Sequence, residues 1–183
     1  MTMTMTAIQH DRPARAGFTL VELMLVVVLM GIISASVIPA MANVQDMRSG
    51  AARDDIARML GVTRARAMAT GAPMGLSVNL ADSRLDIVEI GADGDAAEIY
   101  EPLTGQTRSI SISSAYSGVG IERMVNGDGT SGSGTIWFDY EGAPHMRNQD
   151  GSFASLNEEP VEIELDSGER VLVYAYTGVV GTP

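Results

Sequence analysis

A long apolar run near the N-terminus limits what this chain can fold into. From Phe18 to Ala42 the sequence is mostly Leu, Val, Ile, Met and Ala, and Leu23 to Ile33 contains no polar side chain. As a helix the run measures about 38 Å, more than the ~30 Å of a hydrocarbon core. Arg12 and Arg15 precede it, and basic residues tend to stay on the cytoplasmic side. The sequence therefore predicts a transmembrane helix, with the acidic part of the chain that follows it on the outer side of the membrane.

One residue, Glu22, breaks the apolar run. A carboxylate inside a membrane segment costs on the order of 2–4 kcal/mol unless it finds a partner. A free α-amino group at the start of a neighbouring subunit's helix would neutralise this charge. Such an amine exists only if the chain is cut just before the run, where Gly17 precedes Phe18. The position of Glu22 thus favours cleavage followed by assembly.

These residues resemble a known processing site. The stretch Gly17 to Glu22, Gly-Phe-Thr-Leu-Val-Glu, is similar to that of type IV prepilins and type II secretion pseudopilins. The resemblance implies that a prepilin peptidase cuts after Gly17 and N-methylates Phe18. It also implies that Glu22 contacts a neighbour's N-terminus during assembly. The family's helix proline corresponds to Pro39, which together with Gly31 is expected to kink or loosen the helix.

The resemblance also implies location and partners. Residues 1–17 are expected to be a cleaved leader, and residues 18–42 a transmembrane and assembly helix. The expected partners are the prepilin peptidase, other pilin or pseudopilin subunits, an inner-membrane assembly platform and the lipid bilayer. The subunit would cross the bacterial inner membrane once, with its C-terminal domain in the periplasm, before it enters a filament. Type II secretion, a type IV pilus and a competence filament remain open, as do minor and major subunits.

An ordinary secretory signal is the competing interpretation. Ala40-Met41-Ala42 matches the small-residue pattern of a cleavage site after Ala42. Cleavage there would release a soluble exported binding protein, and without cleavage the same protein would stay membrane-anchored. Glu22 argues against this alternative, because the apolar core of an ordinary signal has no use for a carboxylate.

The helix is expected to continue through residues 43–71 as an amphipathic segment. Its apolar residues recur mostly every three to five positions, which gives one apolar stripe. On the other faces, Asp54 and Arg58 are predicted to pair at i,i+4. Gly71, followed by Pro73, predicts the end of the helix. The stripe comprises Val44, Met47, Ala51, Ile56, Met59, Leu60, Thr63 and Ala67.

Residues 72–183 are predicted to form a β-rich domain. Short apolar or alternating runs are separated by Gly, Asp, Asn and Ser. The last two runs predict a hairpin in which Glu162 and Glu164 point to solvent. The predicted class is α+β, a long N-terminal helical spine packed on an antiparallel sheet. The expected strands are Met74–Leu80, Leu85–Ile90, Ser109–Ser113, Val119–Val125, Thr135–Tyr140, Val161–Leu165 and Val171–Tyr176.

Three further segments extend the resemblance to a subgroup. Leu60–Val78 is similar to the helix-to-sheet passage of the minor pseudopilins called GspH or FimT-like. The segments Ile136–Gly142 and Tyr176–Val180 resemble the closing strands of that group.

Composition weighs against several other functions. The chain has no cysteine, which excludes disulfides, thiolate metal sites and a cysteine nucleophile. Its net charge is −11, and most of the acids follow residue 78, which disfavours nucleic acid as a partner. His145 is expected in a loop without the partners of a catalytic triad, and Trp137 and Phe138 are expected in a core strand. We predict no enzyme activity, no catalytic residue and no cofactor.

Two acidic loops and one basic helix face have both functional and structural interpretations. Asp93–Asp95 and Asn126–Gly129 offer oxygen ligands for Ca²⁺, but their Asn-Gly and Asp-Gly pairs are also frequent turn formers. We favour turns and predict no metal site. A basic face of the helix could meet anionic lipid or an acidic neighbour, but pairing with Asp54 and Asp55 is the simpler interpretation. That face consists of Arg53, Arg58, Arg64 and Arg66.

Overall fold

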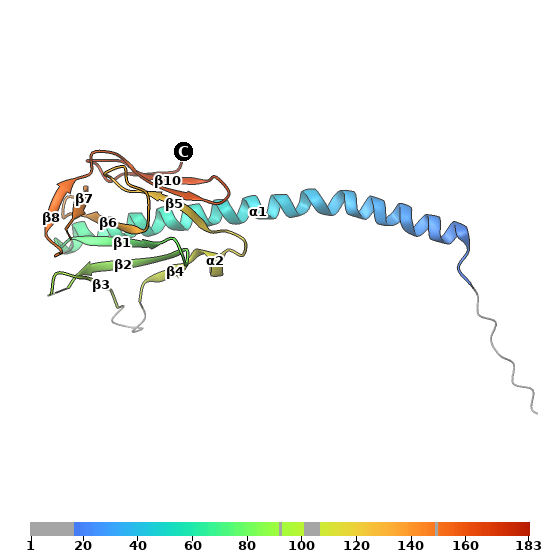
Figure 1. Ribbon diagram of the computed structural model, residues 1–183, viewed down its shortest axis with the longest axis horizontal. Coiled ribbons are helices and arrows are strands. Elements are labelled where there is room, and N and C mark those ends of the chain that lie inside the picture. The colour runs from blue at the N-terminus through green and yellow to red at the C-terminus, as the bar shows by residue number, and fades with distance from the viewer. Residues whose placement is uncertain (1–16, 92, 101–106, 149) are drawn as a thin grey trace, which may run out of the picture. The chain divides into compact units, whose positions relative to one another are not determined.

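The computed structural model describes residues 17–91, 93–100, 107–148 and 150–183, except for the side chains of residues 36–42. One long helix, α1, spans Leu20–Thr70. The chain divides into two compact units, Met1–Met41 and Ala42–Pro183, and α1 contributes to both. In the second unit, β-strands are arranged around the C-terminal part of α1 (Figure 1).

Helix α1 ends where the sequence predicts. Gly71 has a φ of +69°, and its N–H donates to the carbonyl of Ala67 at 3.0 Å. Glycine accepts this left-handed conformation without a Cβ clash, so it closes the helix. The prediction that Gly71 stops the helix is confirmed.

The buried stripe of α1 begins later than predicted. Ile56, Met59, Leu60, Thr63 and Ala67 are buried as expected. Val44, Met47 and Ala51 are exposed, so their assignment to the stripe is wrong. Ser49 and Ala52 are buried in their place. The reason is geometric, because steps of three and four residues from 49 to 67 follow the 3.6-residue turn, whereas the predicted steps from 47 to 51 to 56 drift off that face.

A seven-stranded antiparallel sheet covers one side of this stripe. Its order is β3-β2-β1-β6-β7-β8, with β4 also paired to β2. Met74, Leu76 and Val78 of the central strand β1 point into the core, whereas Gly75 lies opposite Trp137. The strands are β1 (Met74–Asn79), β2 (Arg84–Ile90), β3 (Ala96–Glu98), β4 (Ser109–Ser111), β6 (Gly134–Phe138), β7 (Pro144–Arg147) and β8 (Phe153–Leu156).

A second antiparallel sheet of four strands completes the core, in the order β11-β10-β9-β5. The predicted hairpin is confirmed, since Ile163 of β9 pairs with Val171 of β10. Val161, Ile163 and Leu165 join the core cluster together with residues of α1 and of the larger sheet. The strands are β5 (Ile121–Val125), β9 (Val161–Leu165), β10 (Arg170–Val173) and β11 (Val180–Gly181).

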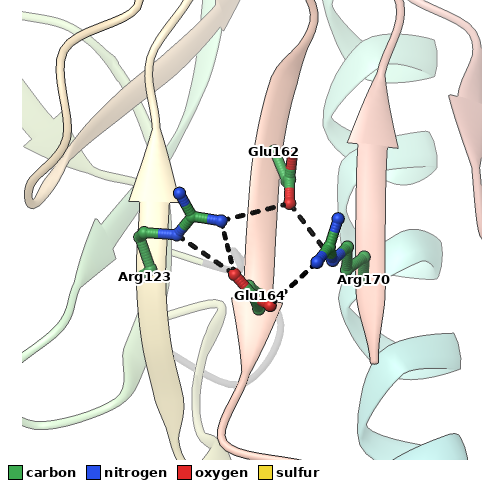
Figure 2. Close-up of polar contacts among 4 residues, drawn as sticks. All are labelled: Arg123, Glu162, Glu164 and Arg170. Carbon is green, nitrogen blue, oxygen red and sulfur yellow. Dashed lines mark hydrogen bonds and ion pairs between the residues drawn. The ribbon is translucent and has the colours of Figure 1, made fainter. Parts of the chain in front are cut away.

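The opposite face of the second sheet carries an ion-pair network rather than free glutamates. Figure 2 shows Glu162 and Glu164 flanked by Arg123 and Arg170 from the neighbouring strands. Arg123 lies 2.6 Å from Glu164 and 3.6 Å from Glu162, and Arg170 lies 3.3 Å from each. These contacts leave both carboxylates only partly exposed. The hydrogen bond from Arg123 is the main reason that the pKa of Glu164 is lowered.

Several strand predictions need correction at their ends. Helix α2 (Ile112–Ala115) shortens the predicted strand at Ser109, because the Ser111 hydroxyl caps that helix by accepting from the N–H of Ser114. The strands predicted to reach Tyr140 and Tyr176 stop at Phe138 and Val173, where turns begin. The sequence missed β3, β7, β8 and β11. His145 lies in β7 and is buried, so its placement in a loop is wrong.

One type of hairpin turn recurs five times in the described part of the chain. In each five-residue turn the first N–H donates to the fifth carbonyl, and a glycine at position four donates to the first carbonyl. That glycine has a φ between +74° and +89° in every case. This is the geometry of a type I turn followed by a left-handed residue. The turns are Gly91–Asp95, Asn126–Thr130, Asp139–Ala143, Asn148–Ser152 and Leu165–Glu169.

Polar contacts hold α1 against the loop that follows α2. Gln45 donates to the carbonyl of Gly118 at 2.6 Å, and Arg48 donates to that of Ser117 at 3.3 Å. The hydroxyl of Tyr116 donates to the carboxylate of Asp55. This hydrogen bond is the main cause that lowers the pKa of Asp55 and raises that of Tyr116.

The predicted pairing of the basic helix face with Asp54 and Asp55 is confirmed for Arg53 and Arg58. Arg53 pairs with Asp54 at 2.9 Å and with Glu169 at 2.8 Å. Arg58 pairs with Asp55 at 2.8 Å, so the predicted i,i+4 pair with Asp54 is wrong. Arg64 donates to the carbonyls of Gly142 at 3.0 Å and Thr177 at 2.9 Å. Arg53 and Arg64 therefore hold the helix to its own domain.

Candidate processing and assembly site

The start of α1 is a reciprocal cap between Thr19 and Glu22. The N–H of Glu22 donates to the Thr19 hydroxyl at 3.2 Å, and the N–H of Thr19 donates to the Glu22 carboxylate at 3.3 Å. Leu23 then donates to the Thr19 carbonyl at 3.1 Å, which closes the first helical turn. This arrangement is a capping box, and it satisfies two N–H groups that a helix start leaves free. A carboxylate at this end also interacts favourably with the helix dipole.

The capping role of Glu22 was missed at the sequence level, although the signal was present. Thr19-Leu-Val-Glu22 has the Thr-x-x-Glu spacing of a capping box directly before an apolar run. Glu22 therefore has a function within its own helix in addition to any function toward a neighbour. The same carboxylate is exposed, so it remains accessible to a cation from another molecule.

Gly17 and Phe18 lie outside the helix, immediately before the cap. Both are exposed, with Phe18 at 79%, and no atom lies within 4 Å of the place where a Gly17 Cβ would stand. The Gly17–Phe18 bond is therefore open on the non-helical side of Thr19. This peptide bond therefore lies outside the hydrogen-bonded part of α1.

The helical surface after the cap has no intramolecular cover. Every described residue from 17 to 35 is exposed, although burial of one large apolar side chain is worth about 1.5–3 kcal/mol. An exposed apolar surface of this kind indicates an interaction site. The largest exposed side chains of this surface are Phe18, Leu20, Val21, Leu23, Met24, Leu25, Val26, Val27, Val28, Leu29, Met30, Ile32 and Ile33.

Among the residues that the structure describes, no helix combines the length and apolarity needed to cross a membrane.

Gly31 and Pro39 are the two positions at which the sequence predicts a kink in α1. Gly31 lies within α1, and nothing lies within 4 Å of the position of a Cβ there. Pro39 also falls within the bounds of α1, but its side chain lies outside the described part. The kink remains a prediction.

The loops considered for calcium have the internal bonds of turns. The carboxylate of Asp128 accepts from the N–H of Thr130 at 2.9 Å and from its hydroxyl at 2.7 Å, which lowers the pKa of Asp128. Asp93 and Asp95 belong to a turn in which the N–H of Gly91 donates to the carbonyl of Asp95 at 2.8 Å. Within the described ranges, no group of three or more His, Asp or Glu residues could hold a metal ion.

Comparison with known proteins adds two findings. The prokaryotic N-terminal methylation motif matches residues 12–38, which include Gly17, Phe18 and Glu22. Two solved structures of the minor pseudopilin EpsH from the type II secretion system of Vibrio cholerae share the fold, with TM-scores of 0.54 and 0.53. They are 11% and 13% identical in sequence, cover 74% and 76% of this chain, and are themselves covered to 94%. No curated protein matches the chain in sequence.

The motif match and the structural likeness agree with each other. The motif covers the cap and the apolar surface, whereas the structural likeness extends over most of the chain, with its antiparallel sheets packed on α1. The chain thus carries the prokaryotic N-terminal methylation motif at its start and has the fold of the minor pseudopilin EpsH.

Proposed function

We propose that this chain is a minor pseudopilin or pilin-like subunit that is processed after Gly17 and assembled into a filament. The observation that carries the proposal is the match of residues 12–38 to the methylation motif, on a helix whose apolar surface is uncovered. A subunit of this kind is a structural component rather than an enzyme.

The proposed cycle begins in the bacterial inner membrane. Residues 18–42 anchor the precursor there in a single pass, with Arg12 and Arg15 inside and the β-rich domain in the periplasm. The prepilin peptidase removes residues 1–17 and N-methylates Phe18. The apolar surface of α1 then moves from lipid to the helices of neighbouring subunits, with the help of an inner-membrane assembly platform.

Glu22 exchanges partners during this cycle. In the uncut chain its carboxylate accepts from the N–H of Thr19. After cleavage, the terminal amine of Phe18 on an adjacent subunit is a stronger partner, because it carries a positive charge. A buried carboxylate without such a partner is strongly unfavourable, so this pairing sets the register between subunits.

We also infer the type of filament from the fold. The two EpsH structures come from a type II secretion system, which favours a pseudopilus over a type IV pilus or a competence filament. Deletion of this chain's gene in its own host should therefore reduce secretion of folded exoproteins more than it reduces twitching motility or DNA uptake.

The mature N-terminus tests the central claim. Mass spectrometry of the protein from membranes, with and without the prepilin peptidase, should show N-methyl-Phe18 only when the peptidase is present. A chain that begins at Asn43 would instead identify an exported protein with an ordinary signal. An intact leader in cells that contain the peptidase would also overturn the proposal.

A further inference from the structure

The larger sheet ends on one side in a strand with an open edge. Strand β8 pairs with β7 along one edge, and no strand of the described part of the chain pairs with the other. Figure 1 shows β8 at the outside of the domain, beside β7. All four of its residues are exposed, with Phe153 at 56% and Leu156 at 40%. An open edge of this kind is a template for a further strand.

Leu156 presents its main-chain groups to the open edge. The N–H of Asn157 donates to the carbonyl of Pro144 at 3.3 Å, which makes these two residues a hydrogen-bonded pair of the ladder. Hydrogen-bonded and non-hydrogen-bonded pairs alternate between antiparallel strands. The next pair, Leu156 with His145, is therefore of the second kind, so the N–H and C=O groups of Leu156 point away from β7.

Phe153 does the same at the other end of β8. The N–H of Asn148 donates to the carbonyl of Ser152 at 3.0 Å, so the following pair, Phe153 with Arg147, is again non-hydrogen-bonded. Between the two ends, a β-bulge places two residues of β8 opposite one of β7. Phe153 and Leu156 therefore present their N–H and C=O groups as alternate residues of a regular strand do.

The edge of β8 lacks the protection that the other sheet edges of the described chain have. Strands β3, β4 and β11 have only two or three residues, and β5 carries the charged Glu122 and Arg123. Short length and charge are common ways to prevent strand addition. Strand β8 is longer than the first three and contains no charged residue.

Phe153 also offers an apolar surface to a further strand. The centre of its ring lies 5.6 Å from that of His145, which in turn pairs with Trp137 of β6. Phe153 is therefore the exposed end of a row of rings that crosses three strands. An apolar side chain opposite it would continue the row, as cross-strand pairs do within a sheet.

A hollow of about 280 Å³ lies beside the end of β8. Met146 and Leu156 form an apolar part of its wall, and Asp128, Glu158 and Glu159 also line it. None of the ion pairs within the described ranges includes these three carboxylates. The apolar wall suits the methylene chain of a Lys or Arg side chain, and the carboxylates suit its charged group.

The charges around β8 determine which kind of strand fits the edge. The exposed Asp150 precedes β8, and the exposed Glu158 and Glu159 follow it, so both ends of the edge are negative. Arg147 of β7 is half-buried and donates to groups of its own domain. Two copies of β8 paired with each other, in either direction, would bring acid against acid. A basic partner is complementary to the edge, whereas a second copy is not.

We propose that the open edge of β8 binds an extended basic segment of another protein by strand addition. The main chain of that segment bonds to the N–H and C=O groups of Phe153 and Leu156, and its apolar side chains lie against the same two residues. A Lys or Arg of the segment occupies the hollow beside Glu158 and Glu159. In this mode the main chain supplies affinity and the side-chain sites supply specificity. The binding concerns the β-rich domain and does not depend on assembly through α1.

Synthetic peptides test the proposal. We would measure the fluorescence anisotropy of a dye-labelled peptide, acetyl-Lys-Val-Lys-Val-Lys-Val-amide, with the full-length protein in neutral detergent micelles at pH 7, and with micelles alone. The anisotropy should rise saturably with the protein. The same peptide with methylated backbone N–H groups should bind at least about tenfold more weakly, because it cannot donate to the edge. A peptide with Glu in place of each Lys should not bind.

Variants of β8 and of the nearby acids identify the surface. Leu156→Pro removes an N–H that faces the open edge without breaking a bond to β7, and it should weaken binding about tenfold or more. Glu158→Gln combined with Glu159→Gln should weaken binding about tenfold by removal of the charges at the hollow. The matched control, Glu89→Gln with Glu122→Gln, changes the net charge equally at exposed positions of β2 and β5, and should bind within about twofold of the parent protein.

Three results would overturn the proposal. An equal loss in the control pair would mean that the peptide responds to the net charge of the domain and not to β8. Undiminished binding of the N-methylated peptide would exclude main-chain pairing. The third is the absence of a saturable rise beyond that with micelles alone, at protein concentrations up to about 0.1 mM. The N-methylated peptide and the Gln pair keep the test decisive if Leu156→Pro unfolds.

Discussion

The two halves of α1 share one secondary structure but differ in what covers them. From Leu20 to Ala35 every side chain is exposed, and nearly all are apolar. From Ser49 to Ala67 every third or fourth side chain is buried by two sheets of the same chain, while the other faces carry Arg and Asp. The second half is therefore covered within its own domain, whereas the first half presents an exposed apolar surface, which we propose is covered by lipid and then by other subunits.

This difference separates stability from assembly along a single helix. Substitutions in the covered half should act on the free energy of unfolding of the domain. Substitutions in the uncovered half should leave unfolding unchanged and act on processing, membrane contact or filament contact.

Glu22→Leu should abolish filament assembly while leaving cleavage after Gly17 intact. The substitution removes the one charged side chain between Leu20 and Ala35, which is the partner that we propose for the amine of Phe18. Cross-linking of subunits in cells, together with the mature mass, measures both outcomes.

Thr19→Ala is the matched control for Glu22. It removes one side of the capping box and costs about 1 kcal/mol of local helix stability, but it keeps the carboxylate. Assembly should largely survive. Equal loss of assembly in both variants would mean that Glu22 serves only to cap its own helix.

Ile56→Ala should lower the free energy of unfolding by about 2–5 kcal/mol, because it leaves a cavity in the core. Ile56 is 0% exposed, whereas Ile32 is 62% exposed, so Ile32→Ala should change unfolding by less than about 0.5 kcal/mol. Urea unfolding in neutral detergent, followed by Trp137 fluorescence, measures both. Similar losses in the two variants would show that the halves are not energetically separate.

Local sequence patterns predicted one part of this architecture well. The bounds of β9 follow from the alternation of Val161-Glu-Ile-Glu-Leu165, and the end of α1 follows from Gly71. In both cases the determining signal lies within a few residues of the feature. The methylation motif is local in the same way.

The missed features depend on contacts between distant residues. Phe153–Leu156 shows no alternation, and β8 exists because β7 provides its partner. His145 is buried because it pairs with Trp137 and Leu156, which no local pattern reveals. Ser49 and Ala52 are small enough to lie under a sheet, but small residues also occur on exposed faces.

Gly178→Ala should loosen the end of the covered half. A Cβ at this position would stand 2.0 Å from the carbonyl of Gly142, the group that also accepts from Arg64. Gly178 also has a φ of +63°. The substitution should therefore lower the free energy of unfolding by about 2–4 kcal/mol, through backbone strain and displacement of that turn.

Gly168→Ala separates the two causes. Gly168 has a φ of +86°, but nothing lies within 4 Å of its Cβ position, so only the strain of about 1 kcal/mol should remain. Equal losses in urea unfolding for both glycines would rule out the close approach to Gly142 as a determinant.

Tyr116→Phe should lower the free energy of unfolding at pH 7 by about 1 kcal/mol, because it removes the hydrogen bond to Asp55. The pKa of Asp55 is lowered in the folded state, mainly by Tyr116 and then by Arg58. Its contribution is therefore complete above the unfolded-state pKa of about 4 and is lost as the pH falls through the lower folded value.

The pH dependence distinguishes this contact from simple packing. The difference between wild type and Tyr116→Phe should shrink when unfolding is measured at pH 3 instead of pH 7. Tyr140→Phe, at an exposed position, should change neither value. A difference that stays constant with pH would assign the effect to something other than the Asp55 carboxylate.

The smallest effect is expected on the outer face of the second sheet, where Arg123 bridges Glu162 and Glu164 (Figure 2). Arg123→Gln should lower the urea midpoint only slightly, because solvent screens exposed ion pairs and ordering them costs entropy. The difference should vanish near 1 M NaCl, where the Debye length is about 3 Å. Arg170→Gln is the matched variant, since it touches the same two carboxylates at 3.3 Å but without the 2.6 Å contact, and its effect should be smaller still. A large loss that persists in high salt would mean that the network supports the sheet beneath it, and the covered half of α1 would then depend on surface charge as well as on burial.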